Sequence, residues 1–415
     1  MLARPDTLYM YAKEVEIMKT RVTTSAPIHG NVAPGFETVQ TEFARNFTER
    51  GELGAACTIY YRGDKVVDLW GGYRDPQKKL PWQEDTLVLV FSSTKGLAGL
   101  TMALAHSRGL FDYDAPIASY WPEFAQNGKG HITVRQLLAH EAGISSIDEP
   151  LPPAVLANPD VLAAILARAK PAWEPGTRHG YHAFTLGWYE SEIIRRTDPQ
   201  HRTLGRFFHD ELARPLGLEF YIGVPQDVDV ERIALITEPP ILQKLLGMPR
   251  GMMLGALTPG SLTLRAVIPG IRSNLVFNTP TYWSVEIPSA GGIGQASSIA
   301  RAYSVFATGG HELEIKPETL SELQAQAQPP VPGGWRDVIL HMDMAWALGF
   351  LKPFPGYHFG SSDEAYGAPG SGGSFGFADP GAQVGYAYVT NKQGAGILDD
   401  PREKALRDAF YRGIM

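Results

Sequence analysis

The sequence predicts an α/β (α+β) protein in which one sheet is built from both ends of the chain, with a helical insertion between them. Strand-like runs lie toward the two ends, whereas helical periodicity fills the middle third. Of the 415 residues, 44% are hydrophobic and 20% are charged, which is ordinary for a globular chain and too apolar for a disordered one. A chain of this size can bury a large core without disulfides or metals.

The first predicted elements are a helix and a hairpin. Phenylalanines and a valine at helical spacing predict a helix over 37–49. Two strand-like runs, 55–61 and 65–70, flank a short turn that contains glycine, which predicts an antiparallel hairpin. An apolar run over 86–91 then leads directly into Ser92.

The middle of the chain predicts helices that are separated by Pro and Gly clusters. They cover 97–107, 134–140, 160–169, 186–196 and 203–213. The stretch 242–288 is rich in Pro and Gly and has little periodicity, although many of its residues are apolar. Such a long irregular segment is either a wall or lid of a pocket or a peripheral excursion that packs on the body, and the sequence leaves both possibilities open.

The last third returns to short apolar strands and ends in a helix. The strands are expected at 344–351, 373–378 and 384–390, and the helix at 401–412. We therefore expect three parts: an N-terminal extension over 1–30, in which Met18 is an alternative start to Met1; an α/β domain over 31–110 and 290–415; and a helical domain over 111–289 that includes the irregular pocket-wall segment.

Charge and cysteine content exclude several classes of protein. The net charge of -7 and the pI of about 5.9 argue against nucleic-acid binding, which usually needs a basic face. The single cysteine, Cys57, excludes an intramolecular disulfide and the Cys-rich zinc sites. No apolar run approaches the roughly 20 residues that span a bilayer, and residues 1–21 lack the apolar centre of a signal peptide. We expect a reduced, cytoplasmic protein with a small-molecule partner; its oligomeric state is not indicated.

Ser92 and Lys95 form the first candidate site. A Ser and a Lys three residues apart at the start of a helix lie on one face, one turn apart. The hydroxyl then lies at the helix N-terminus, where backbone N–H groups favour a developing negative charge. A desolvated lysine can take the proton whose loss makes serine a nucleophile. The alternative is a capped helix start with a solvated lysine.

Tyr181 is the second candidate, because it follows a Pro-Gly turn at 175–176 and is expected to open a helix. A phenol, with a pKa of about 10, serves as base or acid only beside a cation, and a lysine one helix away would supply one. The alternative is a tyrosine packed under a loop. His179 and His182 have a spacing open to metal ligands, but no carboxylate or thiol cluster accompanies them, so we expect surface or supporting roles and no metal.

The third candidate is the glycine-rich stretch 366–380. Its glycines would let a substrate lie close against the backbone, and an N–H group from such an edge could complete an oxyanion hole. The stretch also contains Gly-x-Ser-x-Gly centred on Ser374, the nucleophile elbow of α/β-hydrolases. That fold requires a helix after the serine and a later histidine. Because a strand is expected after Ser374 and the last histidine is His358, we reject this interpretation.

Taken together, these stretches resemble the serine β-lactamase and penicillin-binding-protein superfamily, and most closely the family VIII carboxylesterases. The landmarks occur in the family's order and cover most of the chain, from about Ile28 to the C-terminal helix; they are 54–72, the Ser92/Lys95 pair, 137–143, 175–183 and 291–294. The resemblance implies a mainly antiparallel sheet flanked by helices and an all-helical inserted domain, with the active site between them.

The resemblance also implies the role of each candidate residue. Ser92 becomes the nucleophile, and Lys95 and Tyr181 become the proton-transfer pair. The implied oxyanion hole consists of the backbone N–H groups of Ser92 and Ser371. The implied substrate-binding residues are Gly370, Ala368 and His182. No cofactor and no metal are implied. For an apolar pocket wall, candidate aromatic residues are Trp70, Tyr113, Trp283 and Phe354.

The chain departs from the family at two positions. Ala183 stands where many β-lactamases have Asn, and Ala368 stands where they have the Lys or His that meets the substrate carboxylate. Replacing a charge-assisted contact by a methyl group removes about 1.5–3 kcal/mol of recognition. We therefore expect a serine carboxylesterase that acts on small uncharged esters through an acyl-enzyme. The alternatives are a β-lactamase, a D-amino peptidase, an acyltransferase of the same fold, and a non-catalytic scaffold or sensor.

Overall fold

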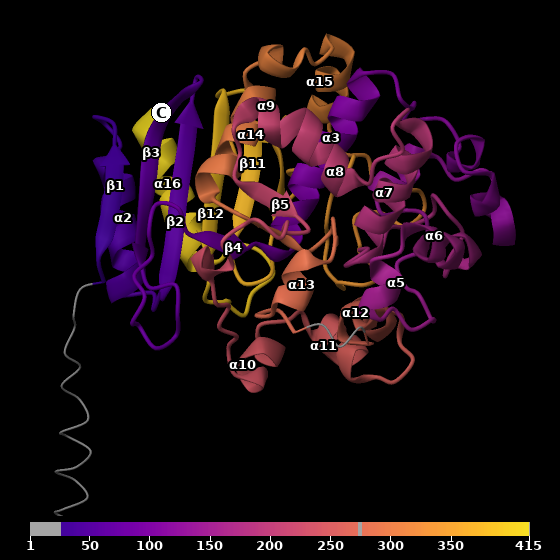
Figure 1. Ribbon diagram of the computed structural model, residues 1–415, viewed down its shortest axis with the longest axis horizontal. Helices are drawn as coiled ribbons and strands as arrows, with labels where there is room; N and C mark the ends of the chain where they lie inside the picture. The colour runs from indigo at the N-terminus through magenta and orange to yellow at the C-terminus, as the bar shows by residue number, and fades with distance from the viewer. Residues whose placement is uncertain (1–25, 273–275, 415) are drawn as a thin grey trace, which may run out of the picture.

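The computed structural model describes residues 26–272 and 276–414 and centres on an eight-stranded sheet (Figure 1). The strand order is β1-β3-β2-β12-β11-β10-β9-β8, and neighbouring strands are antiparallel. The strands are β1 (Ile28–Val32), β2 (Gly54–Tyr61), β3 (Asp64–Gly72), β8 (Trp346–Ala347), β9 (Phe350–Leu351), β10 (Tyr366–Pro369), β11 (Phe375–Asp379) and β12 (Val384–Thr390). Because β12 pairs with β2, both ends of the chain build one sheet, and the predicted fold class is confirmed.

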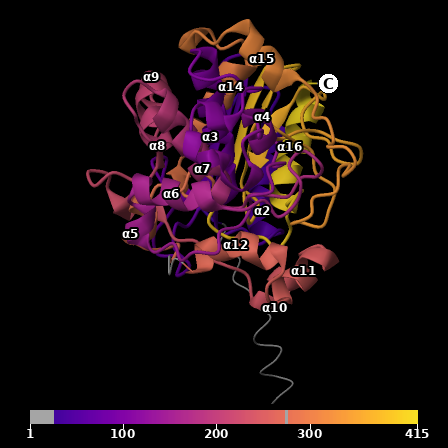
Figure 2. The ribbon, with the colours of Figure 1, turned by 90° about the vertical axis from the view of Figure 1, so that its right-hand side faces the viewer.

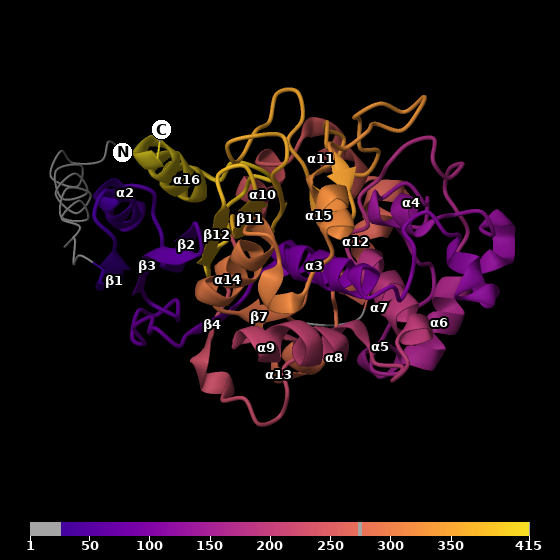
Figure 3. The same ribbon diagram turned by 90° about the horizontal axis from the view of Figure 1, so that it is seen from above.

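Helices cover both faces of this sheet (Figure 3). The helices α2 (Glu37–Thr48) and α16 (Pro401–Ile414) pack against each other on one face, and α14 (Ala296–Ala307) packs on β2, β11 and β12 on the other. Gly385 permits this close approach, since a Cβ there would lie 2.3 Å from the carbonyl oxygen of Ala300. The central strand β12 is buried along its whole length as a result.

The helical part of the molecule packs beside the sheet (Figure 2). Its helices are α3 (Thr94–Ser107), α4 (Val134–Leu138), α5 (Pro153–Leu156), α6 (Pro159–Arg168), α7 (Thr185–Thr197), α8 (Leu204–Phe208), α9 (Arg214–Leu216) and α15 (Pro317–Gln324). A small second sheet, which the sequence did not indicate, has the order β5-β7-β4-β6. Its strands are β4 (Leu87–Leu89), β5 (Phe220–Ile222), β6 (Ile233–Ala234) and β7 (Gly292–Gly294). This sheet holds the segment that leads into Ser92.

The segment expected to be irregular contains four helices instead. They are α10 (Ile241–Leu246), α11 (Arg250–Leu257), α12 (Leu262–Arg272) and α13 (Pro280–Ser284). Pro or Gly residues border α10, α11 and α13, which have five to eight residues, whereas α12 extends over 11. The side chain of Asn278 closes the segment at its base, because it accepts from the N–H and donates to the carbonyl of Ile236, both at 2.9 Å.

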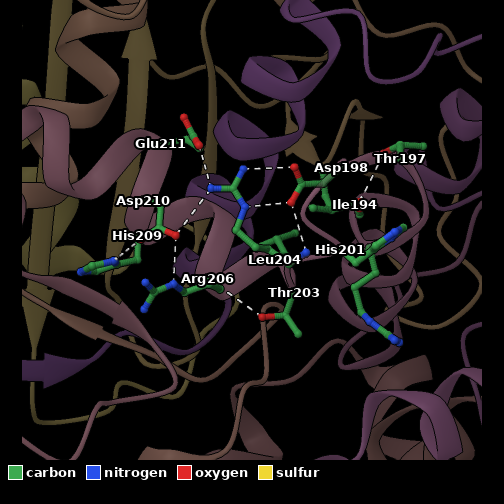
Figure 4. Close-up of polar contacts among 12 residues, drawn as sticks. Ile194, Thr197, Asp198, His201, Thr203, Leu204, Arg206, His209, Asp210 and Glu211 are labelled. Carbon is green, nitrogen blue, oxygen red and sulfur yellow. Dashed lines mark hydrogen bonds and ion pairs between the residues drawn. The ribbon is translucent and has the colours of Figure 1, made fainter.

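A cluster of ion pairs joins the end of α7 to α8 (Figure 4). The guanidinium of Arg202 donates from Nε and Nη2 to the two carboxylate oxygens of Asp198, at 2.8 and 3.1 Å. Its Nη1 donates to Glu211 at 2.7 Å, and Glu211 also pairs with Arg108 at the end of α3. The cluster therefore fixes the far end of the helix that begins beside Ser92.

Two further sequence predictions need correction. The strand β1 starts at Ile28, inside the predicted extension, and pairs with β3. The run 344–351 forms two short strands, β8 and β9, because Leu348 and Gly349 adopt left-handed backbone conformations between them. The questions about Met1 and Met18 concern residues outside the described ones. Within the described residues, no helix combines the length and the apolar character needed to cross a bilayer.

Candidate active site

An apolar pocket of about 160 Å³ opens between the edge of the large sheet and the helical part, and it contains Ser92, Lys95 and Tyr181. Most of its wall comes from side chains outside these three. The large apolar lining residues are Met248, Met252, Leu340, Met344, Trp346, Leu351 and Ile397. None of the four aromatic residues expected from the sequence is among the lining residues. The pocket therefore combines a small polar cluster with a largely hydrophobic wall.

Ser92 lies in a single 3-10 turn, Phe91–Ser93, that runs directly into α3. Phe91 has a φ of 47°, a left-handed conformation that a bulky residue rarely adopts and that costs about 1–3 kcal/mol. Its ring is held by an edge contact with Phe277, whose centroid lies 5.1 Å away. The sharp turn leaves Ser92 partly exposed in the pocket, while Phe91 and Ser93 are buried.

Lys95 lies one turn beyond Ser92 and is almost completely buried. Its Nζ donates to the carbonyl oxygens of Ala183 and Ser289, both at 2.9 Å, and lies 3.5 Å from the Ser92 Oγ. Burial lowers the pKa of Lys95 to about 7, while the nearby carboxyl group of Glu190 acts in the opposite direction. Near neutral pH, this lysine is therefore present partly as the free amine.

Tyr181 supplies the second polar contact of Ser92. Its hydroxyl donates to the Ser92 Oγ at 2.7 Å, and Lys95 Nζ lies 4.6 Å from the centre of its ring. Burial raises the pKa of the Tyr181 phenol above its ordinary value. Contrary to expectation, Tyr181 does not open a helix: α7 begins four residues later, at Thr185, and Tyr181 lies in the preceding loop.

Two residues that sequence analysis missed hold Tyr181 in place. The ring of Trp346 stacks on Tyr181, with 5.2 Å between centroids. The buried carboxyl group of Asp337 accepts from the backbone N–H of Tyr181 at 3.2 Å and from the indole Nε1 of Trp346 at 2.9 Å. No local motif surrounds Asp337, which is distant in sequence, so the sequence carried no signal for it.

Gly370 and Ser371 follow β10 on the pocket wall, where Gly370 packs against the turn that carries Ser92. Within the described part of the chain, no backbone acceptor pairs with the N–H of Ser92 or of Ser371. Gly370 packs so tightly that a Cβ there would lie 2.3 Å from the carbonyl oxygen of Val90. An oxyanion hole requires two such N–H groups directed at one oxygen position, so Ser92 and Ser371 stay its predicted donors.

The remaining candidates separate into those that reach the pocket and those that do not. Ala368 lines the pocket. His182 does not: it is fully buried behind Tyr181, where its backbone N–H donates to Nδ1 of His140 at 3.1 Å. Burial lowers the pKa of His182 to about 3, so it is neutral. The expectation that His182 contacts substrate therefore does not fit its position.

Two other residues that the sequence singled out also lie outside the pocket. Ser374 is buried outside the pocket, and a strand, β11, follows it as expected. His179 is also buried, and its Nε2 bonds the carbonyl of Trp335 at 2.8 Å. Among the described residues, no group of three or more His, Cys, Asp or Glu side chains is placed to hold a metal ion.

Lys244 is a pocket residue that sequence analysis did not single out. It extends from α10 into the pocket wall, and its Nζ pairs with Glu238 at 2.8 Å. The ion pair compensates its charge.

The contacts of Ser92 with Lys95 and Tyr181 place a serine hydroxyl between an amine and a phenol. This geometry is suited to attack on a carbonyl carbon followed by proton transfer to a leaving group.

Comparison with known proteins agrees with this geometry. The Beta-lactamase family model matches residues 42–409. The chain is 31% identical over 366 residues to "Esterase/beta-lactamase LipL" of Mycobacterium tuberculosis, which covers 88% of this chain and 83% of that protein. It is 34% identical to a family VIII carboxylesterase of known structure, with a TM-score of 0.81 over 93% of this chain and 100% of that one.

A second solved structure is equally similar. It is a penicillin-binding protein homologue from Caulobacter crescentus, which is 35% identical with a TM-score of 0.81, again over 93% of this chain and all of the other. These likenesses extend across the sheet, the helical part and the pocket. The protein is a serine hydrolase, and the chain belongs to the Beta-lactamase family.

Proposed function

We propose that this protein is a carboxylesterase that cleaves small uncharged esters through an acyl-enzyme on Ser92. The observation that carries the proposal is the position of the Ser92 Oγ, 2.7 Å from the Tyr181 hydroxyl and 3.5 Å from Lys95 Nζ, in an apolar pocket. The resemblance to family VIII carboxylesterases, stated above, supports the same class of substrate.

In the proposed mechanism, Lys95 acts as the base in acylation. Its amine takes the Ser92 proton as Oγ attacks the ester carbonyl, and the N–H groups of Ser92 and Ser371 bind the oxyanion. The Tyr181 hydroxyl then protonates the departing alkoxide, and the alcohol leaves the acyl-enzyme behind. Water attacks the acyl-enzyme and gives its proton to the Tyr181 phenolate. The Ser92 oxygen then leaves the acyl carbon and takes a proton from the Lys95 ammonium, which restores all three groups.

Preference for an uncharged ester follows from the pocket wall. Ala368 faces the pocket where many relatives carry a cation, and the surrounding side chains are apolar. A substrate carboxylate would lose its hydration there without a dedicated cation, because Lys244 is already paired with Glu238 and Lys95 must be neutral to act as the base. Ala183 contributes only its carbonyl oxygen, which binds Lys95.

The test compares kcat/KM for p-nitrophenyl butyrate, nitrocefin and benzylpenicillin on one preparation. We expect efficient ester hydrolysis that Ser92→Ala abolishes and Ser374→Ala largely retains. Ala368→Lys should shift the ratio toward substrates that carry a carboxylate. An active Ser92→Ala variant together with an inactive Ser374→Ala variant would overturn the assignment of the nucleophile.

β-Lactam hydrolysis is the second candidate, and Lys244 is the observation that favours it. If Glu238 releases Lys244, its ammonium becomes a carboxylate-binding group inside the pocket. In that case nitrocefin turnover equals or exceeds ester turnover, and Lys244→Met lowers it selectively. Equal losses for both substrates in Lys244→Met would contradict this second candidate.

A further inference from the structure

The segment 239–285 differs in charge from the rest of the protein. It contains the cations Lys244, Arg250, Arg265 and Arg272 and no Asp or Glu, although the whole chain has 44 acidic residues and a net charge of -7. The nearest acidic residues in sequence are Glu238 and Glu286 at its two borders. A local excess of positive charge in an acidic protein marks a surface suited to an anionic partner.

The same segment exposes most of the large apolar side chains that face solvent. Six of the ten exposed large hydrophobic residues among the described ones lie in it, with exposed fractions of 60–73%. We call five of them the leucine rim: Ile241, Leu242 and Leu246 on α10, and Leu254 and Leu257 on α11. Clustered exposure of this kind usually marks an interaction surface, whereas isolated exposed leucines need no explanation.

The leucine rim borders the mouth of the pocket that holds Ser92. Lys244 of α10, Met252 of α11 and Met248 between them line that pocket. The helices α10, α11 and α12 gather at one end of the molecule in both Figure 1 and Figure 2. The two short helices therefore present one side to the pocket and their leucines to the solvent beside it.

The charges around the leucine rim favour a lipid surface over a second copy of this chain. Arg250 is exposed at the start of α11, while Lys244 and Arg265 pair with Glu238 and Asp148 at the edge of the segment. With these two ion pairs subtracted, the sequence of the segment keeps an excess of two cations, and a symmetric dimer through this surface would bring both copies of that excess together. Amphipathic helices with apolar residues flanked by cations fit the headgroup boundary of an anionic bilayer.

We propose that the leucine rim docks this protein on an anionic lipid surface, with the pocket mouth turned toward esters dissolved in that surface. The docking depends only on the rim and its charges. The use of lipid-borne esters as substrates rests in addition on the proposed esterase function.

Vesicle flotation tests the docking directly. The Ser92→Ala variant is used, so that hydrolysis leaves the lipids unchanged, with vesicles of phosphatidylcholine alone or mixed with phosphatidylglycerol. We expect co-flotation with the mixed vesicles, weaker binding to phosphatidylcholine alone, and a decrease of binding with salt because the charge contribution is screened.

A rim variant and a matched control assign the binding to this surface. Leu242→Gln, Leu246→Gln, Leu254→Gln and Leu257→Gln are combined, since glutamine retains helix propensity while removing the apolar surface. We expect the combined variant to reduce partitioning into mixed vesicles by about tenfold or more. The control, Leu80→Gln with Val161→Gln, changes two apolar residues of 47% and 45% exposure outside the segment and should bind as the parent does.

Activity assays distinguish a folding defect in the rim variant from a loss of docking. For this assay the rim substitutions are made in the protein that keeps Ser92. This variant should hydrolyse soluble p-nitrophenyl butyrate like the parent, because none of the four leucines lines the pocket. It should lose turnover of a long-chain p-nitrophenyl ester that is presented in mixed vesicles.

Three results would overturn the docking proposal. They are no flotation of the parent, equal flotation of parent and rim variant, and a dimer in light scattering that the rim variant abolishes while vesicle binding is absent. The last result would assign the rim to a second copy of this chain. Flotation that depends on the rim in a protein without ester hydrolysis would support docking and refute the esterase function instead.

Discussion

Two groups with opposite pKa shifts contact the serine hydroxyl. Burial lowers the pKa of Lys95 to about 7 and raises that of the Tyr181 phenol. A lysine with a pKa near the working pH is an effective base, whereas a phenol with a raised pKa remains protonated and can donate. The structure thus supports Lys95 as the base and Tyr181 as the proton donor, whereas the sequence indicated only that the two residues act as a pair.

Tyr181→Phe and Lys95→Ala should each reduce kcat by about 10²–10⁴, the usual contribution of general acid–base catalysis. The double variant should lose little more than either single one, because the two groups act as one unit. Steady-state kinetics with p-nitrophenyl butyrate measure this. Full activity in Tyr181→Phe would show that another group protonates the leaving alcohol.

Glu190 is a buried carboxyl group that the proposed mechanism does not use. Neither of its oxygens has a hydrogen-bond partner among the described residues. Its Oε1 lies beneath the pocket wall, 3.4 Å from the point where a Cβ of the lining residue Gly349 would be. Burial raises the pKa of Glu190 to about 8.

The pKa values of Lys95 and Glu190 predict a bell-shaped pH profile for ester hydrolysis. Activity rises as Lys95 loses its proton, near pH 7, and falls as Glu190 ionises, near pH 8, since a buried negative charge opposes the developing oxyanion. Glu190→Gln stays neutral, so its profile should keep the acid limb and lose the alkaline limb.

Glu192→Gln is the matched control, because Glu192 lies on the same helix but pairs with Arg195 and Arg196. It should keep both limbs of the profile. An unchanged alkaline limb in Glu190→Gln would assign that limb to another group.

The residues of the candidate site that could be predicted are those that carry a local pattern. Ser92 and Lys95 share one turn, and Tyr181 follows a recognisable Pro-Gly turn. Asp337, Trp346 and Glu190 reach the site from distant segments, and only the folded chain places them together. His182 was misplaced because residue type and spacing do not show on which side of a loop a side chain is buried.

At the scale of elements, periodicity predicted the long helices and failed for small or interrupted ones. α2, α3, α6, α7 and α16 lie within a few residues of their predicted bounds. Two helices of 12 and 11 residues, α14 and α12, are exceptions that were not predicted, although their apolar residues recur at helical spacing. The short strands β5, β6 and β7 have two or three residues each, too few for an alternating pattern.

The ion-pair cluster between α7 and α8 gives a prediction at this scale. Arg202→Met leaves the nearly buried carboxyl group of Asp198 without its cation, which should cost about 2–4 kcal/mol of unfolding free energy. Urea denaturation followed by circular dichroism measures the loss. Arg206→Met removes an exposed partner of Asp210, so it should change stability by less than about 1 kcal/mol. Equal effects of the two variants would contradict a structural role for the buried pair.

At the scale of the whole molecule, Arg402 joins both ends of the chain to the active site. It is nearly buried at the start of α16, and its Nη1 pairs with the buried Glu52 at 3.0 Å. Its Nη2 donates to the carbonyl of Gly372 at 2.8 Å, immediately after Ser371. One side chain therefore fixes the first and last segments of the sheet together with the loop that carries the expected oxyanion N–H.

Arg402→Met should reduce both stability and catalysis. Leaving Glu52 buried without its cation should cost about 3–5 kcal/mol, and release of the Gly372 carbonyl should lower kcat in the molecules that remain folded. The measurements are urea denaturation and kcat under conditions where the variant is fully folded.

Arg407→Met is the comparison for this prediction. Arg407 is equally buried and pairs with Glu403 and Asp399, but it has no bond to the Gly372 loop. It should lose stability and keep kcat. If the two variants lose kcat to the same extent, the effect of Arg402 is one of general stability.

The hydrogen bonds between Asn278 and Ile236 mark the boundary between the helices around the pocket mouth and the rest of the protein. The chain leaves the body after Ile236 and returns at Asn278, so the helices around the pocket mouth form a branch that is closed at its base. Ser92, Lys95, Tyr181 and Ser371 all come from other segments. Changes of length or composition in a loop closed in this way need not disturb the body beneath it. Selection can therefore alter which molecules reach the nucleophile by exchanging the outer helices of this branch, as long as Phe277 at its base still contacts Phe91 beside Ser92.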